Sequence, residues 1–165
     1  MISQAVESCL TWAVDDRVVV LGADAEEIAQ TIVDSGVTVV IDPEWREGSS
    51  SPIRAALDLV TRNRSVERCV LGRADQLDVR SEVVNELIST ALTSDADVIV
   101  PKYRYARGWP VVIGPEMWGH LLGQEGDVDL LDTISLHAAS VDEVWFDRIA
   151  PVSLSTAEAV TKEDR

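Results

Sequence analysis

The stretch Arg17-Val18-Val19-Val20-Leu21-Gly22-Ala23-Asp24 decides the fold class of this chain. Its continuous apolar run is typical of a strand buried on both faces, and Gly22 ends that run. A helix is predicted from Asp24 to about Ser35, because apolar residues recur there at intervals of three and four. A buried strand that leads directly into an amphipathic helix is the repeating unit of α/β proteins.

The strand–helix unit recurs along the rest of the chain. Further strands are predicted at Val37–Asp42, Arg68–Gly72, Asp97–Pro101, Pro110–Gly114 and Val141–Asp147. Helical patterns lie between most of them, so we expect a three-layer α/β/α, Rossmann-like domain with a mostly parallel sheet. In such sheets ligands bind beyond the carboxyl ends of the strands. The 165 residues predict a single domain over residues 1–160 and a polar tail over residues 161–165.

The charge and composition of the chain limit the kinds of binding partner that we expect. The chain has 14 Lys and Arg against 29 Asp and Glu, a net charge of −15, which repels nucleic-acid backbones and anionic membranes. No apolar run reaches the roughly 20 residues of a bilayer span. A small phosphorylated ligand needs only a local basic pocket and is compatible with this charge. Cys9 and Cys69 lie far apart beside apolar residues, which favours free thiols in a reducing cytoplasm over a disulfide.

The loop Gly72-Arg73-Ala74-Asp75-Gln76-Leu77-Asp78 follows the third predicted strand. Mg²⁺ in phosphate chemistry is commonly held by one or two carboxylates together with substrate phosphates. Asp75 is therefore a candidate metal ligand, with a turn residue as the equally weighted alternative. For Asp78 the favoured interpretation is a turn or capping role beside Ser81.

A second candidate is the stretch Glu47-Gly48-Ser49-Ser50-Ser51-Pro52-Ile53-Arg54. Small residues before a helix expose backbone N–H groups at its positive end, which predicts an anion site at Ser50 and Ser51 with Arg54 as a charged fork. The alternative, a serine-rich helix start with a solvated Arg54, is somewhat favoured. The stretch is not a Walker A loop, since the chain contains no GxxxxGK[ST] pattern.

A third candidate is Lys102-Tyr103-Arg104-Tyr105-Ala106-Arg107-Gly108-Trp109-Pro110. It gathers three cations and three aromatic residues within a strongly acidic chain. Cations held against the overall charge suggest an anionic ligand, and aromatic rings can stack on a planar group. The alternative is a surface loop whose cations pair with neighbouring acids; we favour the ligand-binding interpretation. Elsewhere, Trp118 and Trp145 fall at positions that predict packing in the core.

Several of these segments, in this order, resemble a known family. The stretches Val18–Ile28, Asp42–Gly48 and Ser50–Leu57 look like the MobA-like NTP transferases, which include the molybdenum cofactor guanylyl- and cytidylyltransferases. Ala74-Asp75-Gln76 matches the family segment that carries its Mg²⁺-binding aspartate. Pro101-Lys102-Tyr103 with the later Arg107-Gly108-Trp109-Pro110-Val111 resembles the family's Pro…Arg-Gly-His-Pro-Val segment, with Trp109 in place of His.

The resemblance implies a fold of the nucleotide-diphospho-sugar transferase type and a specific reaction. That reaction is transfer of a nucleoside monophosphate from CTP or GTP to a phosphorylated acceptor such as molybdopterin. It implies Asp75 as the catalytic residue and Mg²⁺ ligand, with Ser50, Ser51 and Arg54 on the nucleotide or its phosphates. The residues implied for the acceptor are Lys102, Arg104, Arg107, Gly108 and Trp109.

The chain departs from the family pattern at both ends. The family's opening strand and its Leu-Ala-Ala-Gly-x-Ser-x-Arg-Met-Gly loop have no counterpart, because Met1–Ala13 resembles the helix that follows them. The family's Asp-Ile-Asp-Thr-Pro-Glu segment corresponds to Ser153–Glu158, where serines replace acids. Without the first strand, two strands expose their edges unless another segment, a partner chain or a second copy covers them.

Three explanations fit these departures. The chain is a degenerate relative, one part of a split or dimeric assembly, or the product of an internal start codon in a longer gene. The alternative to an enzyme is therefore a catalytically silent ligand-binding or regulatory module of the same fold.

Overall fold

The computed structural model describes residues 2–63, 65–76 and 78–153. Its helices are α1 (Ile2–Cys9), α2 (Ala25–Ile32), α3 (Ser50–Arg62), α4 (Ser81–Ala91), α5 (Pro115–Leu122) and α6 (Leu130–His137), with 3₁₀ turns at Val33–Ser35 and Trp45–Glu47. Its strands are β1 (Val18–Leu21), β2 (Thr38–Ile41), β3 (Cys69–Leu71), β4 (Val98–Tyr103), β5 (Val111–Ile113) and β6 (Val141–Phe146). The predicted tail at 161–165 and residues 154–158 of the family-like segment lie outside the described residues.

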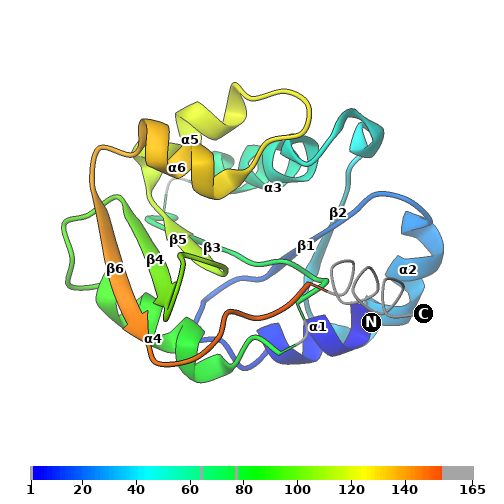
Figure 1. The fold of residues 1–165 in the computed structure, drawn as a ribbon. Helices are drawn as coiled ribbons and strands as arrows, with labels where there is room; N and C mark the ends of the chain where they lie inside the picture. The colour runs from blue at the N-terminus through cyan, green and yellow to red at the C-terminus, as the bar shows by residue number, and fades with distance from the viewer. Residues whose placement is uncertain (1, 64, 77, 154–165) are drawn as a thin grey trace, which may run out of the picture.

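The elements form the three layers expected from the sequence. Figure 1 shows α3, α5 and α6 on one side of the strands and α1, α2 and α4 on the other. Separate apolar clusters fill the two interfaces, one under α5 and α6 and others under α4 and under the α1–α2 pair. The chain therefore has an α/β fold with helices on both faces.

The direction of the strands corrects the expectation of a mostly parallel sheet. β1 pairs with β2 and β4 pairs with β6 in parallel, but β5 runs antiparallel to both β3 and β4. The cause is the connection between β4 and β5, which has no helix. A parallel neighbour needs a crossover of about a dozen residues or more, whereas a short link reverses the chain.

The strands also fall into two sheets. Within the described residues, β1 and β2 form one sheet and β3-β5-β4-β6 form the other, with no ladder from β1 to β3. Helix α3 contacts β1 and β2, and its Leu57 belongs to the apolar cluster against which Cys69 and Leu71 of β3 pack. On the opposite face, Ala13 after α1 donates its N–H to Asn85 of α4 at 2.9 Å.

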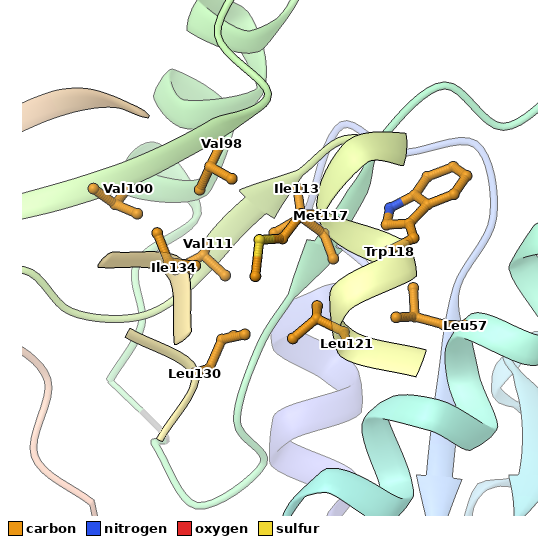
Figure 2. Packing of buried hydrophobic residues seen from close by; sticks show 10 residues of the cluster. All are labelled: Leu57, Val98, Val100, Val111, Ile113, Met117, Trp118, Leu121, Leu130 and Ile134. Atoms are coloured by element: carbon orange, nitrogen blue, oxygen red, sulfur yellow. The ribbon is translucent and has the colours of Figure 1, made fainter. Parts of the chain in front are cut away.

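The largest apolar cluster lies under α3, α5 and α6 (Figure 2). Its members are Leu57, Val98, Val100, Val111, Ile113, Met117, Trp118, Leu121, Leu130 and Ile134. Trp118 is buried as expected, but Trp145 is 63% exposed because it lies on β6, at one end of the strand order. Both cysteines are free, and burial raises the pKa of the Cys69 thiol to about 11.

In the part of the chain that the structure describes, no helix is long and apolar enough to cross a membrane.

Two leucines of α3 test whether this cluster holds the two sheets together. Leu57 is completely buried, whereas Leu59 on the same helix is 36% exposed. We expect Leu57→Ala to lower the free energy of unfolding by about 2–5 kcal/mol, because it leaves a cavity in a packed core. Leu59→Ala should cost less than about 1 kcal/mol. Urea denaturation followed by circular dichroism measures both, and equal losses would contradict this role of α3.

Candidate functional site

The carboxylate of Asp75 is fixed by two neighbours just beyond β3. The Arg73 guanidinium donates through Nε to Oδ1 at 3.0 Å and through Nη2 to Oδ2 at 2.8 Å. The Ser153 hydroxyl donates to Oδ2 as well. The structure thus brings together Asp75 and Ser153, two residues that lie far apart in the sequence.

These contacts set the charge of the site. The Arg73 guanidinium, with a smaller contribution from the Ser153 hydroxyl, holds the pKa of the Asp75 carboxyl below its ordinary value. The same pairing raises the pKa of Arg73. Asp75 is therefore an ionised carboxylate at neutral pH, and its charge is balanced by Arg73.

The donor set around Asp75 suits a cation that arrives with a ligand. Carboxylate and hydroxyl oxygens are hard donors of the kind that Mg²⁺ and Mn²⁺ prefer, and Mg²⁺ commonly takes one or two carboxylates plus substrate phosphates. Among residues 2–63, 65–76 and 78–153, no group of three or more His, Cys, Asp or Glu side chains could hold a metal ion. The site fits a metal–nucleotide complex, in which phosphate oxygens supply the remaining ligands.

The Asp75 loop is packed between two distant parts of the chain. The Gln76 amide donates to the Pro151 carbonyl at 3.2 Å, which ties the loop to the segment after β6. On its other side, a Cβ on Gly72 would lie 2.8 Å from Cη2 of the Trp12 ring. Glycine at position 72 thus permits the close approach of Trp12, and the loop has little room to move.

The predicted phosphate-binding residues Ser50, Ser51 and Arg54 lie together, and each has protein partners. The Ser51 hydroxyl donates to the buried carboxylate of Asp42 at 2.5 Å, and the Ser50 N–H donates to the Gly126 carbonyl at 3.2 Å. Arg54 donates to the Gln124 carbonyl at 2.6 Å and to Glu44 at 2.9 Å, and it also pairs with Glu47. These contacts join the start of α3 to the turn between α5 and α6.

Gly48 shows how closely these segments approach. Its φ is +129°, and a Cβ there would lie 2.3 Å from the carbonyl carbon of Gly126. Only glycine fits both the backbone conformation and the space. The serine-rich stretch thus acts as a structural clamp in this structure.

The predicted acceptor-binding stretch forms a hairpin whose cations are paired with acids of and just after β6. Arg107 and Lys102 lie 2.6 and 3.9 Å from Glu143, and Arg104 pairs with Asp147. The Tyr103 ring is buried and its hydroxyl donates to the Trp109 carbonyl at 2.8 Å. The Gly108 N–H donates to the Pro101 carbonyl at 3.2 Å. These contacts match the alternative interpretation, a loop whose charges are neutralised by neighbouring acids.

The loops after β3, β4 and β6 lie at one edge of the four-stranded sheet. β3 and β4 both run antiparallel to β5, and β6 runs parallel to β4, so their carboxyl ends point the same way. A pocket of about 340 Å³ lies there, lined in part by Arg80 and Arg148. The sequence analysis missed both arginines, because each is a single cation that belongs to no motif.

The match to known proteins decides the family. A family model described as the MobA-like NTP transferase domain matches residues 1–141. The chain belongs to the MobA-like NTP transferase domain family. No curated protein matches this chain.

Solved structures of this family and of other nucleotidyltransferases share its fold. Rv0371c from Mycobacterium tuberculosis, solved in complex with manganese, is 19% identical with a TM-score of 0.83, over 98% of this chain and 84% of that one. The 4-diphosphocytidyl-2C-methyl-D-erythritol synthase of Anaerococcus prevotii is 14% identical with a TM-score of 0.71, over 99% and 86%. Molybdopterin-guanine dinucleotide biosynthesis protein A of Archaeoglobus fulgidus is 18% identical with a TM-score of 0.51, over 87% and 67%. At these identities the likeness shows the fold alone.

The ion pair of this MobA-like domain makes a prediction about pH. The pKa of Asp75 is lowered in the folded state, so the pair stabilises the fold above the ordinary carboxyl value of 3.8 and is lost as pH falls through the lowered pKa. Because the pair is partly exposed, Arg73→Gln should cost at most about 1 kcal/mol at pH 7. The difference from the unmodified chain should shrink as pH falls below 3.8 and through the lowered pKa of Asp75.

Denaturant unfolding of both proteins between pH 3 and pH 7 measures this loss. Carboxyl NMR of Asp75 gives a second readout, since its pKa should rise toward 3.8 in Arg73→Gln. An unchanged Asp75 pKa in the variant would show that Arg73 does not control the carboxylate.

Proposed function

We propose that this chain transfers a nucleoside monophosphate from CTP or GTP to a phosphorylated acceptor such as molybdopterin, in the cytoplasm. Family membership supports a nucleotide substrate. The observation that carries the proposal is the meeting of Asp75, Arg73 and Ser153 at the carboxyl edge of the sheet, where α/β proteins of this type bind ligands.

In this proposal Asp75 and Ser153 contact a divalent cation that enters with the nucleotide. The crystal structure of Rv0371c with manganese supports a divalent metal in this fold, and Mg²⁺ is the ion that we propose for this chain. When bound, the cation neutralises charge on the triphosphate during attack at the α-phosphorus. Arg73, released from Asp75, then offers a planar fork of donors to the phosphate oxygens.

A specific observation favours the catalytically silent module as a second candidate. Every cation that the sequence singled out as a ligand contact already has a protein acid as partner: Arg54, Lys102, Arg104 and Arg107. Arg73 is likewise paired with Asp75. A module of this kind would bind a nucleotide or another small ligand without transferring it.

Isothermal titration calorimetry with Mg·CTP and Mg·GTP tests the proposal. We expect one of the two nucleotides to bind, and Asp75→Asn to weaken that binding at least tenfold, because the variant removes the single carboxylate at the cation. Asp78→Asn is the matched control: it is an exposed carboxylate in the same loop and should leave the affinity unchanged.

A second measurement separates the two candidate functions. With molybdopterin as acceptor, release of pyrophosphate from the bound nucleotide supports transfer. Binding without pyrophosphate release supports the silent module. Absence of heat with both nucleotides would refute nucleotidyl transfer by this chain.

A further inference from the structure

The pocket at the carboxyl edge of the four-stranded sheet contains positive charge that the rest of the fold does not use. Arg80 reaches it from the residue before α4, and Arg148 reaches it from the segment after β6. Within the described residues, neither side chain has an ion pair or a side-chain hydrogen bond. Two carboxylates, Asp78 and Asp147, also line the pocket.

Most other basic side chains in the described residues have a partner; Arg62, which is exposed at the end of α3, is an exception. Arg54, Arg73, Lys102, Arg104 and Arg107 are paired with carboxylates. Arg17 and Arg68 donate to backbone carbonyls, and Arg46 lies over the Trp45 ring. In an acidic protein a guanidinium readily finds a carboxylate. Two guanidinium groups that line one pocket without such a partner therefore retain their donors for an anion.

The backbone adds to the positive potential of the pocket. Arg80 is the N-cap residue of α4, an 11-residue helix, so the positive end of the helix dipole lies at the pocket. Of the two carboxylates at the pocket, Asp147 is already neutralised by Arg104. By contrast, a second pocket at the start of α2 is lined by Asp24, Glu26 and Glu27, whose charges disfavour an anion.

The remaining lining is apolar. Val83 and the ring of Tyr103 are buried, while Ile149 is 71% exposed. A charged side with two arginines and an apolar side with Ile149 and Pro151 match a ligand that has a phosphate at one end and an apolar body at the other. Such a ligand is a phosphorylated small molecule; a bare phosphate would fill only the charged side.

We propose that Arg80 and Arg148 bind the phosphate group of the phosphorylated acceptor, a site that deepens the proposed transfer function and rests on it. The pocket adjoins the Asp75 loop, because Gln76 of that loop donates to Pro151, which itself lines the pocket. Asp75 does not line the pocket, so the acceptor and the metal-bound nucleotide occupy neighbouring sites. The three cations of the hairpin, Lys102, Arg104 and Arg107, take no part in this phosphate site. They are paired with Glu143 and Asp147.

Phenyl phosphate, which joins an aromatic ring to a phosphate, is the probe for this site. NMR titration of the full chain should show binding of phenyl phosphate, with weaker binding of inorganic phosphate and none of phenol. We expect Arg80→Gln and Arg148→Gln each to weaken phenyl phosphate about tenfold and the double variant to abolish binding. Arg62→Gln is the matched control, because Arg62 is exposed in the last turn of α3 and outside the pocket.

The outcomes separate this proposal from the proposed function. Absence of phenyl phosphate binding, or binding that the double variant leaves intact, would overturn the site. An equal loss in Arg62→Gln would also overturn it, since the effect would then follow overall charge. Calorimetry with Mg·CTP and Mg·GTP on the double variant should give the affinity of the unmodified chain. If the unmodified chain binds phenyl phosphate through both arginines but binds neither nucleotide, the pocket stands and nucleotidyl transfer fails.

Discussion

Apolar packing by helix α3 is the interaction on which the rest of the structure depends. In the described chain, no hydrogen-bond ladder joins the β1–β2 sheet to the β3-β5-β4-β6 sheet. Backbone pairing therefore cannot set the position of one sheet relative to the other. Helix α3 contacts β1 and β2, and its fully buried Leu57 lies in the same apolar cluster as Val111 and Ile113 of β5. Each loop at the carboxyl edge is attached to a strand of one of these two sheets. The geometry of the candidate site therefore depends on side-chain packing.

The acidic composition then decides which cations are left for a ligand. In a chain with a net charge of −15, basic side chains have many carboxylates available as partners, and the hairpin after β4 shows the result. Its three cations meet Glu143 and Asp147, which lie 36 to 43 residues further along the chain. A cluster of cations in the sequence of an acidic protein is thus weak evidence of a binding site. Two cations that line one pocket without an ion pair are stronger evidence, as at Arg80 and Arg148.

Local periodicity was enough to predict most elements, because an apolar strand such as Val18–Leu21 and an amphipathic helix such as α4 have their patterns within a dozen residues. The antiparallel direction of β5 was not predicted, because the choice of its neighbours β3 and β4 is a long-range pairing that three apolar residues do not encode. The exposure of Trp145 has the same origin, since sequence patterns do not show that β6 ends the strand order.

The same distinction applies to the candidate site: residues that follow a strand can be identified from local sequence, whereas contacts between distant residues cannot. Asp75 was identifiable because it lies in the loop after an apolar strand, and Arg73 lies two residues away in the same loop. The contact from Ser153 spans 78 residues and depends on the path of the chain after β6. In the proposed function, the Ser153 hydroxyl would offer the cation an oxygen that carries no negative charge. The Asp75–Arg73 pair has no net charge with which to attract a free cation. In the proposed function, this pair can exchange partners with a metal–triphosphate complex, in which the metal ion is positive and the phosphates are negative. The arrangement therefore favours a nucleotide that brings its own metal over a resident ion.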